Sequence, residues 1–81
     1  MATTKDEIRR WIISAKERGA THCIIVCDTF SYDDYPVDVM PGTDIHKSIG
    51  DHSMNMQKVM EVYKMSMDLD EQLNSHRSNN I

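Results

Sequence analysis

The sequence has few of the features that stabilise small proteins from outside their core. Its 81 residues include only two cysteines, Cys23 and Cys27. On one extended strand these residues lie about 13 Å apart along the axis, beyond the roughly 7 Å Cα limit for a disulfide. Two reduced cysteines in an apolar run favour a reducing compartment. A domain this small buries only about 60–65% of its unfolded surface, so it often needs a metal or a partner subunit.

Long apolar stretches and an excess of basic residues are also absent. The chain has no N-terminal region of signal-peptide type and no apolar run near 20 residues. We therefore expect a cytoplasmic protein without a membrane partner. The net charge is −4, whereas duplex nucleic acid usually binds a basic face. The composition therefore argues against duplex nucleic acid as a partner.

The first half of the chain predicts a helix followed by a β-hairpin. Thr4 and Glu7 form a capping box, and apolar residues then recur with helical spacing, which predicts a helix over residues 4–18. An unbroken apolar run predicts a strand covered on both faces at about residues 21–29. Alternating residues predict a second strand at about 36–40, and the two strands are expected to pair.

The second half predicts a polar connection and one long helix. Residues 42–52 suit a loop with a short helical turn capped by Thr43. On a wheel at roughly 100° per residue, apolar side chains of residues 53–76 occupy more than half the circumference. Residues 77–81 are expected to be a disordered tail. Residues 1–81 are thus expected to be a single α+β domain in the order α-β-β-α, with the hairpin packed by two helices.

This expected fold leaves apolar surface without cover. A two-stranded sheet is marginal in water, and three or more strands are normally needed. A helix that covers one side of a sheet needs an apolar stripe of only about 100°. We therefore expect a homo-oligomer in which a second copy completes the sheet and covers the long helix.

The hairpin loop is the most distinctive surface that the sequence predicts. Phe30, Tyr32 and Tyr35 place three rings within six residues. Because exposed rings are unfavourable in water, they are expected either to cover an apolar edge or to line a pocket. Arg9 and Arg10 are candidate partners for phosphate groups, although the alternative of a solvated basic helix face is favoured.

Two polar residues at the start of the expected long helix complete the candidate ligand site. Asn55 and Gln57 carry amide groups suited to hydrogen bonding with a base edge, beside the N-terminal amides of that helix. Together with the arginines and rings, they predict a nucleotide site. If helix one and the hairpin are distant within one chain, two subunits are expected to form it.

Catalysis and metal binding receive little support from the sequence. A carboxylate-bound metal would require Asp28, Asp34 and His46 to converge. His46 and His52 have acidic neighbours, but the spacing of these two histidines matches no zinc signature. Cys27 is the less buried cysteine, and the carboxylate of Asp28 beside it is expected to raise its pKa. No catalytic residue, metal site or cofactor is expected, and the chain is not expected to be an enzyme.

Three parts of residues 5–76 carry a family resemblance. They are Gly19-Ala20-Thr21-His22, the stretch Val26-Cys27-Asp28-Thr29-Phe30 with Tyr32 and Asp34-Tyr35-Pro36-Val37, and Asn55-Met56-Gln57-Lys58-Val59-Met60-Glu61-Val62-Tyr63. These strings resemble a group of small phage and prophage proteins without an assigned enzyme activity. The resemblance therefore implies no residue role. By analogy with other small phage proteins, it implies that the chain counteracts a host defence.

Three functions follow as hypotheses. The first is a homo-oligomeric binder that sequesters a nucleotide-type signalling molecule, with rings stacking on the base and arginines pairing with phosphates. The second is a protein–protein inhibitor, for instance of a host defence protein, or an acidic nucleic-acid mimic without a small ligand. The third is a small metal-dependent hydrolase. A flat acidic surface without a pocket favours the second, and converging Asp28, Asp34 and His46 favour the third.

Overall fold

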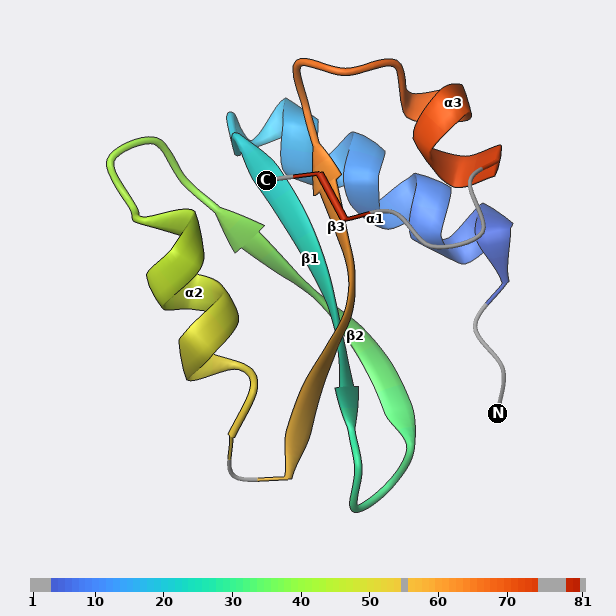
Figure 1. The fold of residues 1–81 in the computed structure, drawn as a ribbon. Coiled ribbons are helices and arrows are strands. Elements are labelled where there is room, and N and C mark those ends of the chain that lie inside the picture. Colours follow the sequence, from blue (N-terminus) through green and yellow to red (C-terminus); the bar gives the residue numbers. More distant parts are fainter. Residues whose placement is uncertain (1–3, 55, 75–78, 81) are drawn as a thin grey trace.

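The structure is a computed structural model that describes residues 4–54, 56–74 and 79–80. Helices and strands in these residues follow the order α-β-β-α-β-α (Figure 1). The elements are α1 (Lys5–Glu17), β1 (His22–Asp28), β2 (Asp33–Val39), α2 (Ile45–Asp51), β3 (Gln57–Lys64) and α3 (Leu69–Asn74). The α+β class and the β1–β2 hairpin are therefore confirmed.

Helix α1 forms as its sequence predicts. The Thr4 hydroxyl accepts a hydrogen bond from the Glu7 backbone N–H at 3.2 Å, which satisfies an amide that has no partner within the helix. Gly19, with a φ of 85°, ends the helix in the left-handed conformation that glycine adopts without strain. Ile8, Ile12 and Ala15 are buried, so the apolar stripe faces the sheet.

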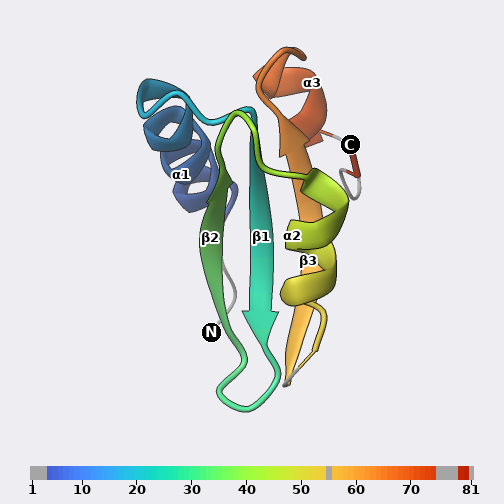
Figure 2. The ribbon, with the colours of Figure 1, turned by 90° about the vertical axis from the view of Figure 1, so that its left-hand side faces the viewer.

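The sheet is antiparallel, with the strand order β2-β1-β3 (Figure 2). Strand β1 lies at its centre, and Ile24 pairs with Val37 on one side and Val62 on the other. The pairing with β3 shifts between Ile25 and Val26, where β3 carries a bulge. As the unbroken apolar run predicts, the middle of β1 is fully buried.

Both faces of the sheet are covered by helices, which explains why β1 is apolar throughout. Helices α1 and α3 lie on one side and α2 on the other (Figure 1). Cys23, Ile25 and Tyr63 belong to the core beneath α1 and α3. Ile24 and Val26 belong to a second core, against which Ile45 and Ile49 of α2 and Tyr35 of β2 pack. Successive β1 side chains therefore enter different cores.

The prediction of one long helix over residues 53–76 is wrong. Residues Gln57–Lys64 form β3, and only Leu69–Asn74 are helical at the end of this range. Residues 55, 75 and 76 of the predicted helix lie outside the described residues. Val62 and Tyr63 are both 1% exposed and, as neighbours on one strand, face opposite sides of the sheet. The wide apolar sector of the helical wheel therefore reflects a strand that is covered on both faces. The bulge also breaks the alternation that identifies a strand.

The connection before β3 also differs in detail from the prediction. Residues Ile45–Asp51 form the complete helix α2 rather than one turn. Its N-cap is Asp44, whose carboxylate accepts from the His46 N–H at 2.9 Å, and not Thr43. Aspartate is a strong N-cap because its side-chain oxygen reaches the free amides of the first turn.

Strand β3 takes the place of the long helix and so removes both reasons for expecting an oligomer, the two-stranded sheet and the uncovered helix face. Strand β3 gives the chain three strands of its own, which meets the usual requirement for a stable sheet. Residues 77, 78 and 81 of the expected disordered tail lie outside the described residues. Asn80, by contrast, donates a backbone hydrogen bond to Val62 of β3 at 3.1 Å. Oligomerisation therefore stays a prediction without support from the sheet.

We expect His22 to make stability depend on pH. Burial, assisted by the charge of Lys64, lowers its pKa from the ordinary value of 6.5. Its buried Nε2 has no hydrogen-bond partner among the described residues. Because the unfolded chain binds the proton more readily, the stabilisation is complete above pH 6.5 and falls as the pH drops through 6.5 towards the lower folded pKa.

Urea unfolding of the wild type and His22→Gln between pH 8 and pH 5.5 measures this contribution. The wild type should lose more unfolding free energy over this range than the variant, since glutamine does not titrate. An equal pH dependence in the two proteins would contradict the assignment to His22.

Candidate binding surface

The end of the sheet at the β1–β2 loop exposes several large apolar side chains. Phe30 and Tyr32 of the loop are 78% and 69% exposed, and Met54 and Met56 of the α2–β3 connection are 54% and 57% exposed. The two segments lie at the same end of the sheet in both views (Figures 1 and 2). We call these four residues the hairpin-end surface.

Hydrogen bonds connect the two segments of the hairpin-end surface. The backbone N–H and the hydroxyl of Thr29 both donate to the carbonyl oxygen of Met56, at 2.7 and 2.8 Å. Within the loop, the N–H of Phe30 donates to the Asp28 carboxylate at 2.8 Å, and the N–H of Tyr32 donates to the Asp28 carbonyl at 2.6 Å. These bonds restrict the backbone that presents the exposed side chains, which lowers the entropy lost on binding.

Both described non-glycine residues with a positive φ belong to this surface. Tyr32 has a φ of 59° and Met56 a φ of 66°. Such conformations are unfavourable by about 1–2 kcal/mol for residues with a side chain. Strained residues of this kind concentrate at functional sites, so their position is a second indication that this end has a function.

Acidic groups surround the hairpin-end surface. Asp28 and Asp33 are cross-strand partners, and Asp34 is the partner of Cys27 one position further along. Lys58 is the nearby basic residue of β3, opposite Cys27. The end of the sheet therefore combines apolar side chains with an excess of negative charge.

The predicted ligand residues fall into two groups that one chain does not bring together. Arg9 and Arg10 are exposed on α1, which covers the half of the sheet away from the hairpin loop (Figures 1 and 2). Arg9 forms an ion pair of 2.5 Å with Asp70 of α3. A site that combines these arginines with Phe30 and Tyr32 would need two subunits, so it stays a prediction.

The remaining predicted ligand residues occupy other environments. Tyr35 is half-buried and packs against the core beneath α2. Gln57 begins β3 opposite Asp28 rather than beginning a helix, so no helical amides accompany its side chain. Asn55 lies outside the described residues. Of the predicted set, Phe30 and Tyr32 therefore form the exposed part that the fold places together.

The residues of the hydrolase hypothesis do not converge. The register places Asp28 and Asp34 on opposite faces of the hairpin, because they occupy adjacent pairing positions. His46 lies on α2, at the start of the helix. Within the described ranges, no group of three or more histidine, cysteine, aspartate or glutamate residues is placed to hold a metal ion.

Both cysteine thiols are held in their protonated form. Burial raises the pKa of Cys23 to about 12, with a further contribution from the charge of Asp38. The pKa of Cys27 is raised first by desolvation, then by a hydrogen bond to Asp34 and by the charges of Asp34 and Asp28. The predicted direction for Cys27 is confirmed, and a raised pKa disfavours the nucleophilic thiolate.

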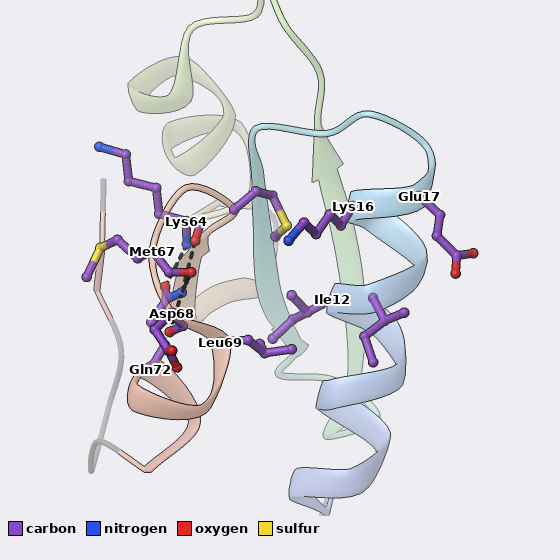
Figure 3. A pocket seen from close by; sticks show the side chains of 10 residues that line it. Ile12, Lys16, Glu17, Lys64, Met67, Asp68, Leu69 and Gln72 are labelled. Atoms are coloured by element: carbon purple, nitrogen blue, oxygen red, sulfur yellow. Dashed lines mark hydrogen bonds between the residues drawn. The ribbon is translucent and has the colours of Figure 1, made fainter.

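A cavity that the sequence did not predict lies between α1 and the segment from β3 to α3 (Figure 3). Its volume is about 520 Å³, and its lining includes Ile12, Lys16, Met65 and Leu69. Its second wall belongs to the range that was expected to be a continuous helix. The sequence pattern therefore gave no signal that the two walls would face each other.

Comparison with protein-family models, with curated proteins and with solved structures yields no match. The resemblance to small phage proteins therefore stays a prediction. Among the described residues, no helix is long and apolar enough to cross a membrane.

Proposed function

We propose that the protein is a non-enzymatic accessory protein that binds a partner protein through the hairpin-end surface. The observation that carries this proposal is the exposure of Phe30, Tyr32, Met54 and Met56 at one end of the sheet. Aromatic residues and methionine are enriched in protein interfaces. A few such side chains often supply most of the binding energy.

The charge around this surface supports a basic partner. Asp28, Asp33 and Asp34 lie beside the exposed rings, and the whole chain carries a net charge of −4. Complementary charges accelerate association and disfavour partners of like charge. Exposed rings also bind guanidinium and ammonium groups through cation–π contacts. An inhibitor of a basic host protein, in a phage setting, is the form of this function that we favour.

Replacing the two loop rings tests this function without disturbing the core. In the double variant Phe30→Ser and Tyr32→Gly, binding to the partner should weaken tenfold or more. Glycine accepts the positive φ of position 32, so thermal stability should be unchanged or higher. Met40→Ser is the matched control, because Met40 is another exposed apolar residue and follows β2 at the end away from the hairpin loop.

The measurement is quantitative capture of proteins from the natural host cells, followed by calorimetry with the purified partner. The wild type and Met40→Ser should retain the same basic protein, and the double variant should lose it. Salt should weaken the complex, since opposite charges contribute to it. Equal capture by all three proteins would contradict the proposal.

A nucleotide-type signalling molecule is the second candidate ligand. The exposed rings of Phe30 and Tyr32 support it, because stacking of a base on an aromatic side chain contributes about 1–3 kcal/mol. Calorimetry against linear and cyclic nucleotides separates the candidates. For a nucleotide binder, Tyr32→Ala and Arg10→Ala should each weaken binding about tenfold, whereas a protein binder should show no heat with any nucleotide.

A further inference from the structure

The cavity between α1 and residues 64–72 has the size and lining of a small-molecule site. Its volume of about 520 Å³ lies within the range of roughly 300–1,000 Å³ typical of ligand pockets. Ile12 and Leu69 approach each other from its two walls (Figure 3). We propose that it binds an anionic amphiphile, a molecule with an unbranched apolar chain and a carboxylate head, whose head group pairs with Lys16.

The directions of the charged side chains around the cavity indicate which charge a ligand's head group should carry. The Glu17 side chain points away from the cavity, and the Lys64 ammonium points away from α1 (Figure 3). The Asp68 carboxylate accepts a hydrogen bond from the Glu71 N–H at 3.0 Å, at the start of α3. Lys16, in contrast, extends from α1 across the gap towards the β3–α3 turn (Figure 3).

Lys16 is therefore the positively charged residue that is directed across the cavity. Within the described residues, its ammonium group makes no hydrogen bond or ion pair. An ammonium group beside an apolar lining complements a ligand with one negative charge and a hydrocarbon chain. A carboxylate head would form a charge-assisted hydrogen bond with it, and the chain would remove apolar surface from water.

Hydrogen bonds and an ion pair connect the elements that form the two walls. The Gln72 side chain bonds to the N–H and the carbonyl oxygen of Lys64, at 2.7 and 2.9 Å, and so holds the turn against α3. The ion pair of Arg9 with Asp70 joins α1 to α3. A preformed site reduces the entropy lost on binding. The cavity lies away from the hairpin-end surface, so the inference does not depend on the proposed protein partner.

Titration of the full-length protein with decanoate tests the inference directly. Calorimetry below the micelle concentration should show saturable binding of one decanoate per chain. Decyltrimethylammonium, with the same chain and the opposite charge, should bind at least tenfold more weakly. Acetate, which has only the head group, should also bind at least tenfold more weakly, because the apolar chain supplies much of the affinity.

Variants of the lining show whether binding occurs in this cavity. Lys16→Glu should weaken decanoate tenfold or more and reverse the preference between the two amphiphiles. Lys47→Glu changes the net charge equally at an exposed position of α2, so it should leave decanoate binding unchanged. Ile13→Trp, at a lining residue that is 43% exposed, should weaken both amphiphiles by narrowing the cavity.

The melting temperatures of the free variants confirm that each still folds. The absence of saturable decanoate binding would overturn the inference. Equal binding of the two amphiphiles, or decanoate binding that Lys16→Glu leaves intact, would also overturn it.

Discussion

Replacing Ile25 with aspartate should abolish the cooperative unfolding transition of the protein. Ile25 lies in the middle of the central strand, is 1% exposed and packs in the core beneath α1. Its partner on β3 is Glu61, so a carboxylate at position 25 would be buried beside a like charge. Burying an unpaired charge costs several kcal/mol, and a domain of this size has only about 4–12 kcal/mol of stability in total.

Circular dichroism during heating measures this effect. Ile13→Asp introduces the same side chain on α1 at a position that is 43% exposed, and it should keep a cooperative transition. A transition in Ile25→Asp that resembles that of the wild type would show that the β1 run is not core.

The second large effect is expected at Gln72, a polar side chain that is only 2% exposed. Its amide oxygen accepts from the Lys64 N–H at 2.7 Å, and its amide nitrogen donates to the carbonyl oxygens of Lys64 and Asp68 at 2.9 and 3.2 Å. Gln72→Ala removes all three of these bonds. The carbonyl oxygens of Lys64 and Asp68 keep the backbone N–H groups of Met67 and residue 72 as donors, so the Lys64 N–H is the group left without a partner. A buried backbone group without a hydrogen bond costs about 1–3 kcal/mol, and we expect a loss of that size.

In a domain of this size, the loss corresponds to a fall in melting temperature of about 5 °C or more. Asn74→Ala is the matched control, because Asn74 is an exposed amide residue on the same helix. It should change the melting temperature little. If Gln72→Ala has the same melting temperature as the control, the stability of the β3–α3 turn does not depend on the Gln72 side chain.

The sequence predicts the first half of the fold because its local signals agree with one another. Thr4, Glu7 and Gly19 mark the two ends of α1. The apolar run of β1 is long enough to require cover on both faces, and the structure supplies that cover as two cores. Local sequence and tertiary packing favour the same conformation in this half of the chain, so a single-sequence prediction succeeds.

The second half could not be predicted in the same way because its local preferences oppose the fold. Glutamine, lysine, methionine and glutamate in Gln57–Lys64 all favour helices. The pairing of β3 with β1 overrides these preferences. One overlooked signal marks the true helix, since Asp68 and Glu71 have the spacing of a capping box and form the corresponding hydrogen bond.

Only the part of the hairpin-end surface that comes from one continuous loop could be predicted from the sequence. Phe30 and Tyr32 belong to one loop, so the sequence alone places them together. The position of their loop beside the Met56 segment depends on β3 being a strand, and the bonds from Thr29 to the Met56 carbonyl join the two segments. The arginines of α1 and the loop rings lie towards different ends of the sheet, and no local sequence pattern predicts this distance between them.

Photo-cross-linking from the hairpin loop tests the proposed function most directly. A photoreactive phenylalanine analogue replaces Phe30 in one version of the protein and Met40 in another, and both are illuminated in cells that naturally contain the protein. We expect a specific adduct with a basic protein from position 30 and not from position 40. No adduct from position 30, or identical adducts from both positions, would contradict a partner site at the hairpin end.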